Sequence, residues 1–380
     1  MIKISSPDRC MGCHACYNAC PAKCITMEYD SEGFLYPHVN EEKCINCNLC
    51  EKVCPVIKRG ELSVNKPKGY VAYSKDADIR RNSSSGGMFY MLAQKILLNG
   101  GVVFAAAFDE NFVLRHSFTE SVEELPKYMG SKYVQSIIGD TYKQAKDFLL
   151  KSRTVLFAGT PCQIEGLKKY LRKDYDNLIT IDIICHGVPS PLVWKKYLNH
   201  LENKYKSKAT AVSFRDKTEG WVKFSLKVNF ENGEIYRLDK TEDLYFTGFL
   251  KNMILRPSCY NCSFKSVNRV SDLTIADCWG VNNIIENYYD DKGTSFILVQ
   301  SEKGSCLLNS IENIRIDEVD TEKPLKFNTA AEKSAPYNEK RDSFFAKVNN
   351  TDIYKLLKKF ANLNILKIKR AVYKLLFGNK

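Results

Sequence analysis

The chain has 380 residues, of which 44% are hydrophobic and 26% are charged, as in soluble globular proteins of two or three domains. It has no apolar stretch of membrane-spanning length, and its first ten residues form no apolar signal segment, so we expect a cytoplasmic protein. Residues 351–380 carry +7 of the net charge of +12, and a body with only +5 argues against nucleic-acid binding.

Two copies of one cysteine pattern, C-x2-C-x2-C-x3-C-P, occupy the first 55 residues. The pattern is that of bacterial two-cluster ferredoxins, in which the fourth cysteine of each copy binds the other copy's cluster. It predicts one [4Fe-4S] cluster on Cys10, Cys13, Cys16 and Cys54, and a second on Cys44, Cys47, Cys50 and Cys20. Structural zinc sites use separated C-x2-C pairs, so the pattern favours iron-sulfur over zinc. Open cluster loops are oxygen-sensitive, which indicates a reducing, anaerobic cell.

The hydrophobic pattern predicts strands and helices in a regular order. In the N-terminal unit, short strands are expected at 25–29 and 35–40. Beyond a polar linker, the pattern predicts strands at 70–73, 102–108, 113–118, 154–158 and 178–184, and helices at 87–98, 121–128, 141–151, 163–171 and 191–204. Further strands are expected at 211–215, 223–229, 234–238, 273–276 and 296–300. The fold class is therefore an α+β ferredoxin module fused to a mixed α/β body, with a parallel β-α-β unit over 154–184.

The last segment, 346–380, is basic and amphipathic. Apolar residues recur at near-helical spacing from Ile353 to Leu376, with lysines between them. The spacing predicts a C-terminal helix that packs on the body or docks reversibly on a membrane surface or a partner.

Four further cysteines stand in functional contexts. Cys162 follows a buried strand, and Cys185 ends the next predicted strand. Because neighbouring parallel strands end at the same edge of a sheet, we expect these two thiols to be close together. Cys259 and Cys262 form a C-x2-C pair. Four thiolates suit a third [4Fe-4S] cluster or a tetrahedral zinc ion, and the third interpretation is a group of unligated buried cysteines.

The three remaining cysteines have no partner pattern. Cys278 is a substitute ligand for the third set, although its apolar surroundings favour a core position. Cys24 and Cys306 are interpreted as small hydrophobic residues.

Six short motifs in one order resemble the coenzyme F420 hydrogenase/dehydrogenase beta-subunit family. They are SSSGG from Ser83, GSKYVQS from Gly130, GTPCQ from Gly159, CHGVPS from Cys185, SFRDK from Ser213 and SDLTIADCWG from Ser271. One position departs from the family, because Cys278 stands where many relatives have phenylalanine. Nothing in the sequence identifies a deazaflavin pocket, so the substrate in the family name is not carried over.

The resemblance implies a division of the chain and two cofactors. We expect a ferredoxin domain at 1–60, a linker at 61–69, the family's N-terminal domain at 70–150, its C-terminal domain at 151–345, and the basic helix at 346–380. The family likeness also implies a bound FAD close to a third [4Fe-4S] cluster, held by the cysteines that match Cys162, Cys185, Cys259 and Cys262.

The implied FAD needs partners for its pyrophosphate and its ring. Hydroxyl and amide groups before the helix at 87–98 suit a pyrophosphate, Lys132 suits a phosphate or the flavin N1 region, and the edge of the sheet suits the isoalloxazine. The predicted cofactor residues are Ser84, Ser85, Gly86, Gly87, Lys132, Gly159 and Thr160. The structural alternatives are an ordinary helix N-cap loop and a solvated surface lysine.

Four other residues are candidates for chemistry. His186 follows a predicted cluster ligand and either transfers a proton or makes a structural hydrogen bond in its loop. Arg215 and Asp216 either bind an anionic substrate or pair with each other. His14 lies inside the first cysteine run, where it tunes the cluster or is exposed to solvent.

The expected function is a flavin and iron-sulfur oxidoreductase. A flavin exchanges single electrons with clusters and electron pairs with organic molecules, so FAD would join the ferredoxin clusters to an unknown small-molecule substrate. A ferredoxin or a reductase would be the redox partner. The alternatives are a non-catalytic electron-transfer protein serving a partner enzyme, and a zinc or nucleic-acid binding module.

Overall fold

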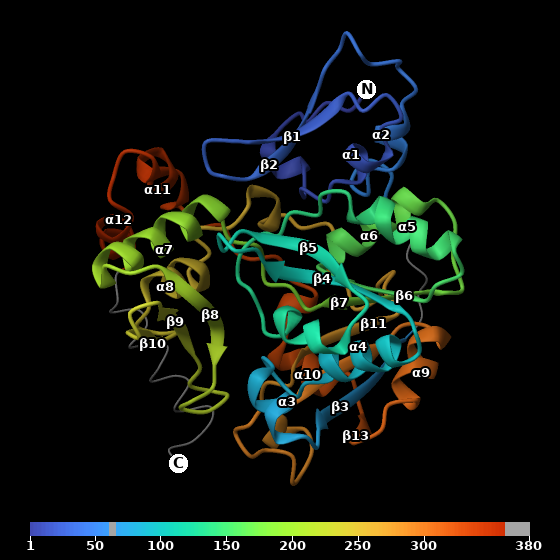
Figure 1. Ribbon diagram of the computed structural model, residues 1–380, viewed down its shortest axis with the longest axis vertical. Coiled ribbons are helices and arrows are strands. Elements are labelled where there is room, and N and C mark those ends of the chain that lie inside the picture. The colour runs from blue at the N-terminus through green and yellow to red at the C-terminus, as the bar shows by residue number, and fades with distance from the viewer. Residues whose placement is uncertain (61–65, 362–380) are drawn as a thin grey trace.

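The computed structural model describes residues 1–60 and 66–361. It has a small N-terminal module, a central sheet with helices on both faces, and a lateral part built from helices and a second sheet (Figure 1). The predicted linker at 61–69 and the predicted tail helix at 346–380 each lie partly outside the described residues.

The N-terminal module consists of a hairpin and two short helices. Strands β1 (Ile25–Tyr29) and β2 (Leu35–Val39) pair antiparallel, as predicted. Each cysteine run contains one helix, α1 (Ala15–Ala19) or α2 (Leu49–Lys52). The residue before each helix has a left-handed backbone, which lets the cysteine loop turn sharply into the helix.

Eight strands form the central sheet in the order β13-β3-β12-β11-β7-β6-β4-β5. Their bounds are β3 (Lys68–Ser74), β4 (Val102–Phe108), β5 (Leu114–Thr119), β6 (Val155–Gly159), β7 (Leu178–Ile183), β11 (Leu273–Asp277), β12 (Ser295–Val299) and β13 (Ile314–Val319). The neighbours β11, β7, β6 and β4 run parallel, whereas the outer strands pair antiparallel. The start of β6 is buried on both faces, as expected for a central parallel strand.

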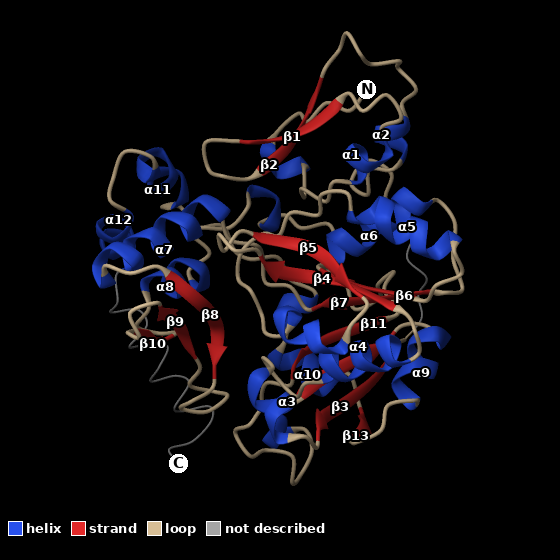
Figure 2. Cartoon of the chain, viewed as in Figure 1, coloured by secondary structure: helices blue, strands red, loops and turns tan. Residues whose placement is uncertain are grey.

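Helices cover both faces of this sheet (Figure 2). On one face, α5 (Thr141–Leu150) and α6 (Pro161–Leu171) pack against β4 and β6. On the other face lie α4 (Met88–Leu98) and α9 (Glu302–Asn309). The chain enters α6 directly from β6, with proline at the first helical position, where a missing N–H costs nothing.

The lateral part has its own aromatic core, which includes Trp194, Phe214 and Tyr245. Its elements are α7 (Pro191–Tyr205), α8 (Leu244–Leu250), α11 (Arg341–Val348), α12 (Ile353–Ala361), β8 (Ala209–Asp216), β9 (Ser225–Phe230) and β10 (Ile235–Asp239). Leu356 and Leu357 are buried in this core, so the start of the predicted tail helix packs on the body.

Most predicted elements agree with the structure to within two residues. The helix expected at 121–128 is a 3-10 helix (Val122–Tyr128), because Pro126 lies inside it and has no N–H to donate. The sequence did not predict α1, α2, α3 (Ala77–Asn82), α8, α9, α10 (Glu322–Phe327), α11 and β13. Within the described residues, no helix has the length and apolar character needed to cross a membrane.

Candidate cluster and cofactor sites

The first predicted ligand set surrounds one cavity in the N-terminal module. Cys10, Cys13, Cys16 and Cys54 all line it, so the structure brings the last cysteine of the second run to the first run. Burial raises the pKa of Cys16 well above its usual range, and the nearby Cys10 and Cys54 thiols raise it further. Thiols in such surroundings become thiolates when a metal supplies positive charge.

The second predicted set lies nearer the surface. Cys50 is buried and its sulfur accepts a hydrogen bond from the Ile2 backbone N–H at 3.3 Å. Cys20 and Cys44 are half-buried in the same cluster of side chains, whereas Cys47 is exposed. The outer wall of this site is therefore open to solvent.

The remaining cysteines do not all follow the sequence interpretation. Cys278 is fully buried in an apolar core and does not line the third cavity, as its surroundings predicted. Cys306 is exposed on α9, so its interpretation as a small core residue is wrong. Cys24 is buried, but its sulfur also lies 3.4 Å from the sulfur of Cys20, a contact with the second set that the sequence pattern did not signal.

The third set lines an enclosed cavity at the carboxyl ends of β6 and β7. These strands are parallel neighbours, as predicted, and they bring Cys162 and Cys185 together. Cys259 and Cys262 reach the same cavity from the loop around residue 260. Burial raises the pKa of Cys162 strongly, and the other three thiols add to this effect. The four sulfurs therefore face one buried space.

Two sulfurs of the third cavity make hydrogen bonds of the kind that stabilise an anionic group. The Val188 N–H contacts the Cys259 sulfur at 3.4 Å, and the Thr160 hydroxyl contacts the Cys162 sulfur at 3.2 Å. Such bonds stabilise cluster thiolates. Among the described residues, no three His, Cys, Asp or Glu side chains converge on a point that would hold a single metal ion. Four thiols around one cavity are a donor set that would suit a [4Fe-4S] cluster.

Helix α6 connects the first and third cavities. Cys162 lies in its first turn, and Gly166 lies one turn later. A Cβ atom at Gly166 would lie 3.1 Å from the sulfur of Cys13, so this helix packs directly on the first cysteine run. Met11 lines both cavities.

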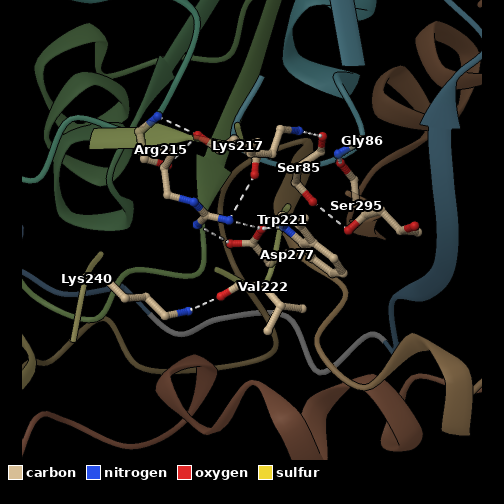
Figure 3. A network of polar contacts seen from close by, with 12 residues as sticks. Ser85, Gly86, Arg215, Lys217, Trp221, Val222, Lys240, Asp277 and Ser295 are labelled. Atoms are coloured by element: carbon tan, nitrogen blue, oxygen red, sulfur yellow. Dashed lines mark hydrogen bonds and ion pairs between the residues drawn. The ribbon is translucent and has the colours of Figure 1, made fainter. Parts of the chain in front are cut away.

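Two of the predicted FAD residues are used within the fold. The Ser85 hydroxyl donates to the Thr294 carbonyl at 2.5 Å, and the Gly86 N–H donates to the Ser295 hydroxyl at 3.0 Å (Figure 3). Gly87 precedes α4 with a left-handed backbone, φ +88°. These contacts tie the serine-glycine loop to the residues at the start of β12, and Gly87 is the N-cap of α4 without a side-chain cap.

Ser84 and Lys132 lie on two adjoining loops. The Ser84 hydroxyl contacts the Ser131 hydroxyl at 2.8 Å. The Lys132 ammonium donates to the carbonyls of Met129 and Gly130 at 2.9 and 3.2 Å and makes no ion pair with a described residue. Lys132 is half-buried, and burial lowers its pKa to about 7, which differs from the solvated surface lysine of the alternative.

His116 on β5 contacts the end of β6, and the sequence contained no motif that would have identified it. Its Nε2 lies 3.0 Å from the Ala158 carbonyl, and a Cβ at Gly159 would lie 3.6 Å from the same nitrogen. Burial lowers the pKa of His116 to about 4, with a further lowering by the Lys132 charge. Its Nδ1 is buried without a hydrogen-bond partner among the described residues. Gly159 therefore lies near His116, and Thr160 lies next to Cys162.

Arg215 is committed to an ion pair that the sequence did not predict. Its two terminal nitrogens bind both oxygens of Asp277 at 2.9 Å, and one of them also donates to the Ser84 carbonyl at 2.9 Å (Figure 3). Asp216 pairs with Arg237 at 3.0 Å. The prediction of an Arg215–Asp216 pair is therefore wrong.

Two lysines lie in the polar network around this ion pair (Figure 3). Lys217 donates to backbone carbonyls, including that of Arg80 at 2.6 Å, and burial lowers its pKa to about 7. Lys240 donates to the Val222 carbonyl at 2.6 Å, and burial lowers its pKa to about 8. Nearby carboxylates, Asp277 among them, act against this lowering in both lysines.

The two candidate histidines are both engaged or buried. The Nε2 of His186 lies 2.6 Å from Asn252 Oδ1, and its ring packs edge-on against Phe249 beside the third cavity. This geometry supports the structural hydrogen bond over proton transfer. His14 lines the first cavity and is buried, so the expected solvent exposure is wrong; burial lowers its pKa to about 3.

Family models match the chain in three places. Residues 9–57 match a 4Fe-4S dicluster domain. Residues 69–140 match the coenzyme F420 hydrogenase/dehydrogenase beta subunit N-terminal model, and residues 152–324 match its C-terminal model. The last two together span more than half of the chain.

No curated protein sequence matched the chain. Among solved structures, it is similar to a chain of the F420-reducing [NiFe] hydrogenase complex from Methanosarcina barkeri, in a xenon derivative. The two share 15% sequence identity and a TM-score of 0.45, with 69% of this chain and 86% of that chain covered.

Proposed function

Because the chain belongs to the coenzyme F420 hydrogenase/dehydrogenase beta-subunit family with a fused 4Fe-4S ferredoxin-type domain, we propose that it is an FAD-dependent oxidoreductase. In this proposal, electrons pass between a redox partner protein and a small-molecule substrate in the cytoplasm of an anaerobic cell. Clusters exchange single electrons and FAD exchanges one or two, so together they join one-electron donors to two-electron substrates.

The residues that would hold three clusters are the three cysteine sets. Cys10, Cys13, Cys16 and Cys54 would hold the first, and Cys20, Cys44, Cys47 and Cys50 the second. Cys162, Cys185, Cys259 and Cys262 would hold the third. The exposed position of Cys47 supports the second site as the place where a redox partner exchanges electrons.

The contact between the first cysteine run and α6 is the observation that carries the proposal. Cys13 lies against Gly166, and Cys162 lies four residues earlier on the same helix. Four residues of an α-helix rise about 6 Å, so the first and third sites would be close neighbours. The short separation supports a continuous electron path from the ferredoxin module into the body.

The region around Lys132 supports a flavin next to the third site. Its ammonium has only carbonyl acceptors among the described residues and would meet a phosphate or the flavin N1 region. Gly159 ends β6 and Thr160 follows it, and Thr160 contacts the Cys162 sulfur at 3.2 Å. A ring bound here would lie beside the third cysteine set.

Flavin analysis of anaerobically purified protein tests this proposal. We expect about one FAD per chain, and Lys132→Met should lose most of it because the buried positive charge is removed. Lys127→Met is the matched control. Lys127 is an exposed lysine on the 3-10 helix Val122–Tyr128, where it pairs with Glu124 at 2.6 Å. The absence of flavin from the wild-type chain would contradict the proposal and favour a non-catalytic electron-transfer protein.

A further inference from the structure

One buried arginine differs from all others in the part of the chain that the structure describes. Four arginines are buried, and Arg256 is the most deeply buried of them, with none of its surface exposed. The other three each bind a carboxylate: Arg80 with Asp290, Arg215 with Asp277 and Arg341 with Glu32. Arg256 makes no ion pair with any described residue. Its charge therefore lacks the compensation that the other three have.

Neutral groups hold Arg256 in place. Its guanidinium donates to the carbonyls of Cys10 at 2.8 Å and Leu35 at 3.0 Å, and to the side-chain oxygen of Gln135 at 2.9 Å. Its planar end also lies over the Tyr36 ring, 4.2 Å from the centroid. These contacts fix its position but supply no negative charge. A buried cation without a counter-charge is strongly unfavourable, so an anion is expected nearby.

Arg256 lies where the first and third cysteine cavities meet. It lines the third cavity directly, and it binds the backbone of Cys10, which lines the first. A Cβ at Gly12, inside the first cysteine run, would lie 3.0 Å from its guanidinium. Burial raises the pKa of Cys259, and the nearby Arg256 charge acts against this effect.

We propose that Arg256 is the shared counter-charge of the first and third clusters and raises the reduction potentials of both. The inference rests on the proposed function, because it requires clusters in both sites. Four thiolates make a bound cubane an anion, and one-electron reduction adds a further negative charge to it. A fixed positive charge favours the more negative state, so Arg256 stabilises the reduced form of each cluster.

Redox titration of the full-length protein, followed by electron paramagnetic resonance with dithionite as the electron donor, tests this role. Arg256→Gln removes the charge, and Gln135→Glu places a carboxylate against the guanidinium without deleting it. We expect both variants to shift the midpoints of two clusters to more negative potentials. The described contacts of Arg256 do not include the cysteines of the second set. The midpoint of the second cluster should therefore stay unchanged and serve as the internal reference.

Gln135→Met is the matched control, because it removes the same neutral hydrogen bonds and leaves the Arg256 charge uncompensated. It should leave all midpoints close to those of the wild type. Unchanged midpoints in both charge variants, or an equal shift in Gln135→Met, would overturn the inference. If Arg256→Gln does not fold, the midpoints of Gln135→Glu alone test the inference. A wild-type chain with two clusters and no flavin would contradict the proposed function, whereas the midpoint of the first cluster would still test Arg256.

Discussion

Replacing Gly166 by alanine probes the contact that joins the first and third sites. The added Cβ would lie 3.0 Å from the Cβ of Cys13, 3.1 Å from its sulfur and 3.1 Å from the hydroxyl of Tyr142. All three distances are shorter than ordinary van der Waals contact. Either α6 or the first cysteine run must therefore move.

The expected change in the free energy of unfolding follows from two opposing effects of the Gly166→Ala substitution. Alanine in a helix interior is normally about 1 kcal/mol more favourable than glycine. Overpacking a closely packed site costs about 1–3 kcal/mol. We therefore expect Gly166→Ala to change the free energy of unfolding by between zero and a loss of about 2 kcal/mol. The same substitution in an unconstrained helix would increase the free energy of unfolding. Because Cys13 is a proposed cluster ligand, its displacement should also reduce the occupancy of the first cluster.

Urea unfolding and electron paramagnetic resonance of anaerobic protein measure both effects. Gly248→Ala in α8 is the control, because its nearest neighbours are side-chain carbons of Leu357 and Ile254, at 3.2 Å and beyond, that can shift. If Gly166→Ala is stabilised as much as Gly248→Ala and keeps the signal of the first cluster, α6 does not constrain Cys13 and the reasoning is wrong.

Three further predictions concern other parts of the fold. Asp277→Asn leaves the buried Arg215 without a carboxylate and should lower the free energy of unfolding by about 3–5 kcal/mol in urea titrations; a loss below about 1 kcal/mol would contradict the buried pair. The pKa of His116 in the folded chain, about 4, lies below its ordinary value of 6.5. As the pH is lowered from 6.5 to 4, the unfolded chain therefore binds the proton first, and the free energy of unfolding should decrease. His116→Gln should flatten that slope, and an unchanged slope would refute the assignment. Iodoacetamide should alkylate Cys306 in the native protein and Cys278 only after unfolding, as measured by mass spectrometry. Alkylation of Cys278 before Cys306 would contradict the described burial.

Local sequence patterns predicted much of the fold. The parallel unit from β6 through α6 to β7 followed from two apolar strands, a proline at the start of the helix and the helical spacing between them. Strand β13 was missed because its residues are only half-buried at the edge of the sheet and show little apolar signal. Helix α8 was missed because it is apolar on nearly all sides, so it lacks the amphipathic spacing that identifies surface helices.

The cysteine sites were predictable for a related reason. Covalent spacing in the two N-terminal runs, and the shared edge of β6 and β7, are properties that the sequence encodes locally. The polar partners are different. Arg215 meets Asp277, and His116 meets the end of β6, only through long-range packing, and neighbouring residues in the chain gave no indication of either contact.

The buried charges show the same limit. The sequence around Arg256 did not mark this arginine as a candidate residue, and only the folded chain reveals that its guanidinium lies between two cysteine cavities. The Ser85 and Gly86 contacts with the start of β12 likewise form across more than two hundred residues of sequence. A motif in one segment therefore did not reveal whether its polar atoms face a ligand or another part of the protein.

Iron and acid-labile sulfide per chain, measured on anaerobically purified protein, test the central claim of a third cluster most directly. Cys162→Ser should lower the iron content from about twelve to about eight per chain, because it removes one ligand of the third cubane alone. Cys306→Ser is the control, since this exposed cysteine lies outside all three predicted ligand sets and should leave about twelve irons. About eight irons in the wild type and in both variants would contradict the third cluster, and with it the electron path into the body.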